Sequence, residues 1–238
     1  ALLAFREYVR VVGLWLDRGT QAVGYLLVVV TVGSVAWVSP GGARQVSAFM
    51  LAPAAVLLTA LAFEVARGRA EQMLQRCCLV TFGTLYCGWL LGHLAYLRNA
   101  LEPTGPILFF LFLVCINDVA AFVSGRSFGR QLLRRRLSPT KTWQGAAGAL
   151  VAIVLVAPSL GWLLPGYRAA EVVLLGAAIS VGGTVGDLAL SGIKRDLGIK
   201  DWSSAIPGHG GVLDRVNSVT FAVPLMCHYA VWVHGIAS

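Results

Sequence analysis

Long apolar runs constrain this chain more than any other feature. Seven stretches are long and apolar enough to cross a bilayer as helices, near residues 20–38, 46–66, 75–97, 104–124, 143–165, 170–190 and 216–236. They are far longer than the alternating strands of a membrane barrel, so strands are not expected. Hydrophobic residues make up 57% of the 238 residues, more than a soluble domain of this length needs. The sequence predicts an all-α, polytopic transmembrane bundle of about seven spans.

The distribution of basic residues predicts which ends of the helices face the cytoplasm. The N-terminal stretch and the connections 67–76, 125–142 and 191–215 would share one side, and they carry 16 of the 19 Lys and Arg residues. The positive-inside rule makes that side cytoplasmic. We therefore expect an integral protein of a bacterial inner (plasma) membrane, with its active site facing the cytoplasm.

The start of the chain and its middle suggest a two-part organisation. The apolar N-terminal stretch contains Arg6, Glu7 and Arg10, which suits neither a free-standing span nor a signal peptide. We expect it to be the tail of an earlier membrane helix. Residues 1–100 would form an N-terminal membrane region and 101–238 the catalytic membrane region.

Two polar side chains within the fourth apolar stretch need a partner or a function. Asn117 and Asp118 lie about two turns from the expected cytoplasmic end of their helix, and a carboxylate within a span is energetically costly. An interhelical hydrogen bond could account for them. A ligand site is the other interpretation, so both remain site candidates.

The connection after that helix contains three consecutive arginines, Arg134, Arg135 and Arg136. A basic run beside a membrane fits a topology anchor or a contact with anionic lipid.

The segment "LSPTKTWQG" follows the arginines. Ser138 followed by Pro139 predicts a helix that begins there with Ser138 as its N-cap. Lys141 and Thr142 would lie in the first turn, where a cation is unfavourable unless an anion binds as well. A phosphate would satisfy both the lysine and the free N–H groups.

A third polar segment, "GGTVGDLALSGIKRD", places three functional groups on one helical face. Asp187, Ser191 and Lys194 are spaced i, i+4 and i+7, which lines up a carboxylate, a hydroxyl and an ammonium. An Asp187–Lys194 pair that stabilises the helix end is the simpler alternative. Arg195 follows directly.

The least membrane-like stretch is "IKDWSSAIPGHGGVLDRVNS". Its proline and glycines cannot continue a helix, and a glycine-rich turn lets backbone N–H groups approach a phosphate. Asp201, Asp214 and Arg215 flank the turn. Because Mg²⁺ prefers carboxylate and phosphate oxygens, Asp187 and Asp214 suit a metal–phosphate site. The residues favour phosphoryl or nucleotidyl transfer onto a membrane-resident phosphate or alcohol.

Three ordered segments also resemble a known family. "SGIKRDLGIKDWSSAIPGHGGVLDRVN" is similar to the C-terminal signature of the phosphatidate cytidylyltransferases (CDP-diacylglycerol synthases). "LSPTKTWQG" and "INDVAAFVSGRSFGR" resemble two further segments of that family, and "AFREY" resembles a short acidic motif. The resemblance covers residues 117–218 and departs from the family at Asn217, where an aspartate is usual.

The resemblance implies an Mg²⁺-dependent reaction of CTP with phosphatidate that gives CDP-diacylglycerol and pyrophosphate. It implies metal binding by Asp187 and Asp214, a second cation being an open alternative, with Asp118 and Asp201 as further acidic candidates. We expect Lys141 and Lys194 to be catalytic with these two aspartates. The expected substrate and phosphate contacts are Ser138, Lys141, Thr142, Ser191, Lys194, Arg195, Lys200, His209, Gly210, Gly211 and Arg215.

The expected partners are the two substrates, the lipid bilayer and a second copy of the chain, but no nucleic acid.

The attacking phosphate is already ionised at neutral pH, so no general base is needed, and we expect His209 to orient a phosphate or the loop. The alternatives are a CDP-archaeol synthase-like enzyme, a polyprenol or phytol kinase, or a transporter. A transporter would spread its polar residues through the membrane depth, whereas here they gather on the cytoplasmic side.

Overall fold

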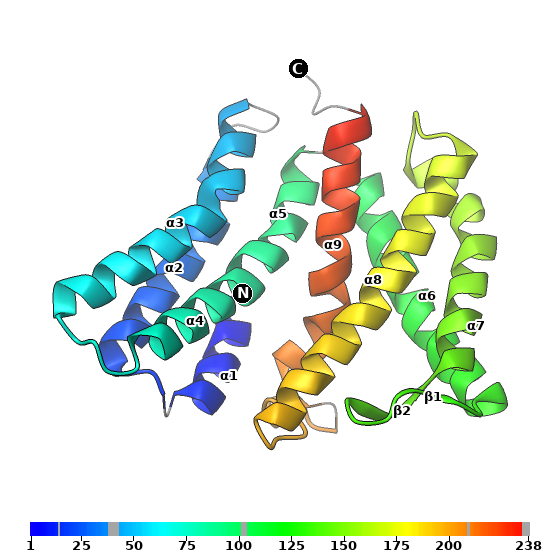
Figure 1. The fold of residues 1–238 in the computed structure, drawn as a ribbon. Coiled ribbons are helices and arrows are strands. Elements are labelled where there is room, and N and C mark those ends of the chain that lie inside the picture. The colour runs from blue at the N-terminus through cyan, green and yellow to red at the C-terminus, as the bar shows by residue number, and fades with distance from the viewer. Residues whose placement is uncertain (14, 38–42, 101–103, 209, 235–238) are drawn as a thin grey trace. The chain divides into compact units, whose positions relative to one another are not determined.

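The chain is almost entirely helical, as a computed structural model of residues 1–13, 15–37, 43–100, 104–208 and 210–234 shows (Figure 1). The helices are α1 (Leu2–Val12), α2 (Arg18–Trp37), α3 (Ala43–Arg67), α4 (Met73–Thr84), a π-helical turn (Leu85–Leu90), α5 (Leu91–Ala100), α6 (Gly105–Phe128), α7 (Trp143–Val156), a 3₁₀ segment (Ala157–Leu163), α8 (Ala169–Asp196) and α9 (Val212–His234). Two short strands are β1 (Leu132–Arg134) and β2 (Ser138–Thr142). The prediction of a nearly all-α fold is confirmed.

Six helical segments in the described ranges are long and apolar enough to cross a membrane. They are Arg18–Val35, Phe49–Arg67, Met73–Arg98, Gly105–Phe128, Trp143–Leu163 and Ala169–Asp196. Each overlaps one of the expected spans, so the helices fit an integral membrane protein. The seventh expected stretch is helical as α9, and its crossing of the membrane stays a prediction.

The helices fall into two compact units, which we describe separately. Unit 1 comprises Ala1–Ala100 and Asp201–Arg215, and unit 2 comprises Leu101–Lys200 and Val216–Ile236. In unit 1, α2 packs against α3, α4 and α5, and the short α1 packs against α2 and α4. Phe5, Tyr8 and Val12 are buried on one side of α1, while Arg6 and Arg10 are exposed on the other. This amphipathic pattern explains why charges occur within an apolar N-terminal stretch.

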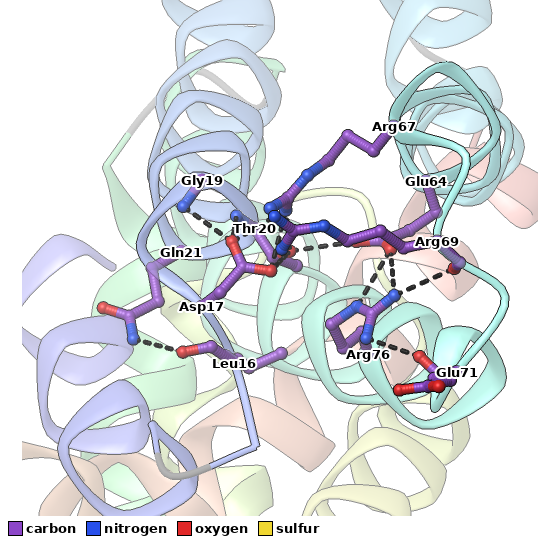
Figure 2. A network of polar contacts seen from close by, with 10 residues as sticks. All are labelled: Leu16, Asp17, Gly19, Thr20, Gln21, Glu64, Arg67, Arg69, Glu71 and Arg76. Atoms are coloured by element: carbon purple, nitrogen blue, oxygen red, sulfur yellow. Dashed lines mark hydrogen bonds and ion pairs between the residues drawn. The ribbon is translucent and has the colours of Figure 1, made fainter.

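A network of paired charges ties α2, α3 and α4 together in unit 1 (Figure 2). The Arg67 guanidinium donates to both oxygens of Asp17 at 2.7 Å. Glu64 accepts hydrogen bonds from Arg76 Nη2 at 2.6 Å, Arg76 Nε at 2.9 Å and the Thr20 hydroxyl at 2.9 Å. Desolvation disfavours the charged form of Asp17, but the hydrogen bonds from Arg67 and Thr20 outweigh it and lower the pKa of Asp17 to about 2.

In unit 2, α6 packs against α7 and α8. An antiparallel hairpin of β1 and β2 joins α6 to α7, with Leu132 opposite Thr142. The hairpin corrects two expectations: strands do occur, and no helix begins at Ser138. The Thr142 backbone is extended and its hydroxyl accepts a hydrogen bond from Gly145 N at 3.1 Å, so Thr142 is the N-cap and α7 begins at Trp143.

Candidate active site

Four elements of unit 2 bring polar side chains together in one cluster. Lys141 Nζ on β2 lies 2.5 Å from Asp187 Oδ2 on α8. The Ser218 hydroxyl on α9 donates to Asp187 Oδ1 at 2.9 Å and lies 3.5 Å from Asp118 Oδ1 on α6. Ser218 thus lies beside two carboxylates, and Lys141 pairs with one of them, Asp187. We call Asp118, Lys141, Asp187 and Ser218 the carboxylate cluster.

Local backbone geometry positions each member of the carboxylate cluster. Because Thr142 caps α7, the residue before it, Lys141, is held in the extended strand β2 that precedes the helix. A side chain at Gly186 could not be accommodated, since its Cβ would lie 2.7 Å from Phe221 Cβ and 2.8 Å from the Asn217 carbonyl oxygen. Glycine at this position therefore allows α8 and α9 to approach closely enough for Ser218 to reach Asp187.

Asn117 has a partner that explains its place within a span. The buried Ser180 hydroxyl on α8 donates to Asn117 Oδ1 on α6 at 2.6 Å. This interhelical hydrogen bond is one of the two interpretations that the sequence left open. It holds together the two helices that carry Asp118 and Asp187.

The other predicted contacts in unit 2 lie around the carboxylate cluster. Ser191 and Lys194 occupy the next two turns of α8 on the face of Asp187, and Arg195 and Lys200 are exposed. Asp187 forms an ion pair with Lys141. Ser138 is buried on β2, where its hydroxyl lies 3.4 Å from the Thr140 hydroxyl.

The glycine-rich loop belongs to unit 1, where Asp214 organises it. Asp214 Oδ2 accepts hydrogen bonds from Trp202 N and Gly211 N, both at 2.9 Å. Gly210 adopts a positive φ of 80°, and a Cβ there would lie 2.9 Å from Asp214 Oδ2 and 3.6 Å from Asp201 Oδ1. The loop therefore gathers Asp201 and Asp214 about a position that only glycine fits. His209 lies outside the described residues, and Arg215 is exposed.

Glu7 holds the same loop from α1, a role that sequence reasoning missed. Its buried carboxylate accepts hydrogen bonds from Val212 N at 2.9 Å, Leu213 N at 2.8 Å and the Ser203 hydroxyl at 2.6 Å. The signal was a carboxylate in an apolar stretch, where an unpaired charge is costly. Protein carboxylates thus already accept the first N–H groups of α9, and a phosphate there would compete with them. Phosphate binding by Gly210 and Gly211 stays a prediction.

Carboxylates are the metal-binding groups that the candidate site offers. No three His, Cys, Asp or Glu side chains of the described residues are placed to bind one ion together. The oxygens of Asp118 and Asp187 share Ser218, and two carboxylates with substrate phosphates form the ligand set that Mg²⁺ uses. The site fits a metal that binds together with its substrate.

The fold and the carboxylate cluster define a helical membrane protein with an ionisable site among its apolar helices. The chain belongs to the cytidylyltransferase family, whose profile matches residues 1–233. The named relatives span both bacteria and plants.

Three relatives illustrate the similarity. The uncharacterized protein YnbB of Escherichia coli is 35% identical over 163 residues, which cover 63% of this chain and 54% of that protein. A phosphatidate cytidylyltransferase of Pseudomonas aeruginosa is 42% identical over 133 residues, covering 55% and 49%. The chloroplastic phosphatidate cytidylyltransferase 5 of Arabidopsis thaliana is 34% identical over 215 residues, covering 76% and 52%. The chain spans about half the length of the curated relatives it matches.

Proposed function

We propose that the protein transfers a cytidylyl group from CTP to phosphatidate and releases CDP-diacylglycerol and pyrophosphate. The observation that carries this proposal is the carboxylate cluster, in which Asp187 contacts both Lys141 and Ser218. Family membership and the names of the relatives support the choice of CTP and phosphatidate. In the proposed reaction the substrate supplies the nucleophile, so no side chain of the cluster has to act as one.

The reaction needs charge neutralisation more than proton transfer. A phosphate oxygen of phosphatidate attacks the α-phosphorus of CTP, and the bond between that phosphorus and the bridging oxygen of the β-phosphate breaks. Pyrophosphate leaves with that electron pair. The attacking oxygen is already ionised at neutral pH, so no side chain must remove a proton. Two anionic substrates must nevertheless approach one another, which makes cationic groups decisive.

We assign the roles in the cluster from its charges. Lys141 lies on β2 just before the start of α7 and neutralises phosphate oxygens that approach Asp187. Asp187 orients Lys141 and is a proposed Mg²⁺ ligand. The family resemblance implies Asp214 as a further ligand. The metal, when bound, supplies neutralisation of the triphosphate. Lys194 and Ser191, on the face of α8 that follows Asp187, are the proposed next contacts.

The membrane arrangement is part of the proposal. The apolar stretches support seven spans, and the charge distribution supports a cytoplasmic site. The family resemblance supports an inner-membrane location and a homodimer. The connections 125–142 and 191–215 carry ten of the 19 Lys and Arg residues, which supports their placement at the cytoplasmic surface.

Identification of the products tests the proposed reaction. The purified full chain is incubated with phosphatidate, Mg²⁺ and CTP labelled in the α-phosphate, with a parallel reaction labelled in the γ-phosphate. We expect the α label in CDP-diacylglycerol and the γ label in pyrophosphate. A γ label in lipid, with release of CDP, would identify a lipid kinase instead. No labelled lipid in either reaction would contradict the proposed activity.

A further inference from the structure

The hairpin of unit 2 carries a basic surface that the proposed reaction does not use. Residues 129–142 connect α6 to α7, and both of those helices belong to candidate spans. Figure 1 shows the hairpin beside the C-terminal end of α6 and reaching toward the C-terminal part of α8. β2, the longer strand, has five residues, and five extended residues reach about 17 Å at most. The hairpin therefore stays close to the ends of the membrane helices.

Contacts with α8 fix the hairpin at its tip and at its base. Leu137, at the tip, packs on Gly192, where a Cβ would lie 3.1 Å from Leu137 Cδ2. Lys141, toward the base, pairs with Asp187. Because both contacts involve α8, the hairpin lies across the helix ends instead of projecting away from them.

The charge on this surface is uncompensated. Five arginines are exposed on the hairpin and at the end of α6: Arg126, Arg130, Arg134, Arg135 and Arg136. The sequence contains no Asp or Glu between Asp118 and Glu171. Within the ranges that the structure describes, none of the five guanidinium groups forms an ion pair. Their counter-ions must therefore come from outside the described chain.

Apolar side chains interrupt the basic surface in the way expected at a membrane interface. Phe128, Leu132 and Trp143 are 70%, 40% and 55% exposed around the base of the hairpin. Aromatic and leucine side chains beside guanidinium groups suit the boundary between acyl chains and headgroups. A surface made only for solvent or for a nucleotide would have no need of these exposed apolar groups.

We propose that the hairpin is an anionic-lipid docking surface, on which Arg134, Arg135 and Arg136 bind the phosphate groups of phospholipids in the surrounding leaflet. The occupant is a lipid headgroup and not free nucleotide, because exposed apolar side chains and the ends of two spans lie beside the arginines. Headgroups reach the arginines directly, whereas attraction over longer distances is screened within about 8–10 Å. The surface would hold anionic lipid beside Lys141 and the carboxylate cluster.

Binding of a lipid that is not a substrate tests this surface independently of the reaction. The full chain in neutral detergent micelles is titrated with fluorescent short-chain phosphatidylglycerol, and anisotropy reports binding. The triple variant Arg134→Gln, Arg135→Gln, Arg136→Gln should bind on the order of 100-fold more weakly, since each such cation contributes about a factor of five. The matched triple Lys variant should retain most of the binding, and added NaCl should weaken it in the parent protein.

Three results would overturn the inference. The Gln variant could bind phosphatidylglycerol as well as the parent does, or the Lys variant could lose as much binding as the Gln variant. A titration with CTP distinguishes the two phosphate sources, since a Gln variant that loses CTP binding but keeps lipid binding would make the hairpin a nucleotide contact. A parent protein that binds phosphatidylglycerol without cytidylyl transfer would instead contradict the proposed function alone.

Discussion

The charged network of unit 1 and the carboxylate cluster of unit 2 are both polar groups among apolar helices, but they differ in balance. In the network, Asp17 and Glu64 face Arg67 and Arg76, two charges of each sign. Among the four residues of the carboxylate cluster, two are carboxylates, Asp118 and Asp187, and one is a cation, Lys141. A balanced set of charges can hold helices together, whereas an excess of carboxylate favours an added cation.

Solvent access separates one pair of the network, Glu64 and Arg76, from the cluster, whereas Arg67 and Asp17 are 21% and 32% exposed. The Glu64 side chain is 1% exposed and that of Arg76 is 10% exposed. The Asp187 and Lys141 side chains are 23% and 28% exposed. A buried, satisfied pair cannot exchange its partner for a substrate, but a half-exposed pair can. Balanced charge and the buried Glu64–Arg76 pair indicate a structural role for the network, and the excess of carboxylate indicates chemistry at the cluster; the following changes test that assignment.

The largest effect is expected from Asp214→Asn. Asparagine keeps an oxygen that accepts the Trp202 and Gly211 N–H groups, so the loop should persist. It loses the negative charge proposed to bind Mg²⁺, and transfer should fall to background in the assay with labelled CTP. Asp196→Asn, an exposed aspartate at the end of α8, is the matched control. Retained Mg²⁺-dependent turnover would refute the metal assignment.

Glu64→Gln should affect stability instead. The change leaves the Arg76 guanidinium without its charged partner, so the melting temperature should fall by several degrees. Thermal unfolding in detergent measures the loss. Glu71→Gln is the control, because this neighbouring side chain is exposed and its backbone oxygen alone accepts from Arg76. Equal stability of the two variants would show that the network does not hold the helices.

Glu7→Gln should affect both activity and stability, because Glu7 positions the loop without being placed at the reacting atoms. An amide supplies one acceptor oxygen where three donors converge, so the start of α9 should loosen. We expect about a 10-fold fall in kcat, in the range seen when partners of catalytic ligands are removed. The Mg²⁺ concentration for half-maximal activity should rise as well. A lower melting temperature with unchanged kcat and Mg²⁺ dependence would make Glu7 purely structural.

Thr142→Ala should have a smaller effect on stability. It removes the N-cap hydrogen bond to Gly145 N and should cost about 0.5–2 kcal/mol, measured by thermal unfolding. Thr142→Ser should restore most of the loss because it keeps the hydroxyl. The same substitution at Ser138 should not mimic Thr142→Ala, since α7 does not begin there. A larger loss of stability from Ser138→Ala than from Thr142→Ala would show that Ser138 is the N-cap.

The smallest effect concerns acid pH. The pKa of Asp17 is lowered to about 2 from 3.8, so its pairing with Arg67 stabilises the fold fully above pH 4. This stabilisation should disappear as the pH falls from about 4 to 2, because the folded carboxylate must then bind a proton. Asp17→Asn should flatten the melting temperature over that window. An unchanged pH dependence in the variant would show that Arg67 does not hold Asp17 ionised.

The sequence predicted the apolar helices well because their length and composition are local properties. It also singled out Asp118, Lys141 and Asp187, since an ionisable group beside or within a span needs a reason. It did not predict their partners. Helical spacing made Lys194 a plausible partner for Asp187, but nothing local indicated Lys141, which lies 46 positions earlier in the sequence and forms an ion pair with Asp187.

The wrong helix start at Ser138 and the missed role of Glu7 both arise from contacts between segments that are not local in sequence. Ser138 and Pro139 have the composition of a helix start, but pairing with β1 keeps this segment extended until Thr142. Glu7 looked like a stray charge because its three partners lie about 200 positions later in the chain. Local patterns identify a cap or a costly charge, whereas tertiary contacts decide which residue serves it.

Turnover by Asp187→Asn tests the central claim most directly, when measured beside the melting temperature of the same preparation. Asparagine is nearly the same size as aspartate and can still accept the Ser218 hydrogen bond. If the carboxylate cluster is the reaction centre, transfer from CTP to phosphatidate should fall to background while the melting temperature changes little. Retained Mg²⁺-dependent transfer in this variant, or loss of activity only through unfolding, would contradict the account.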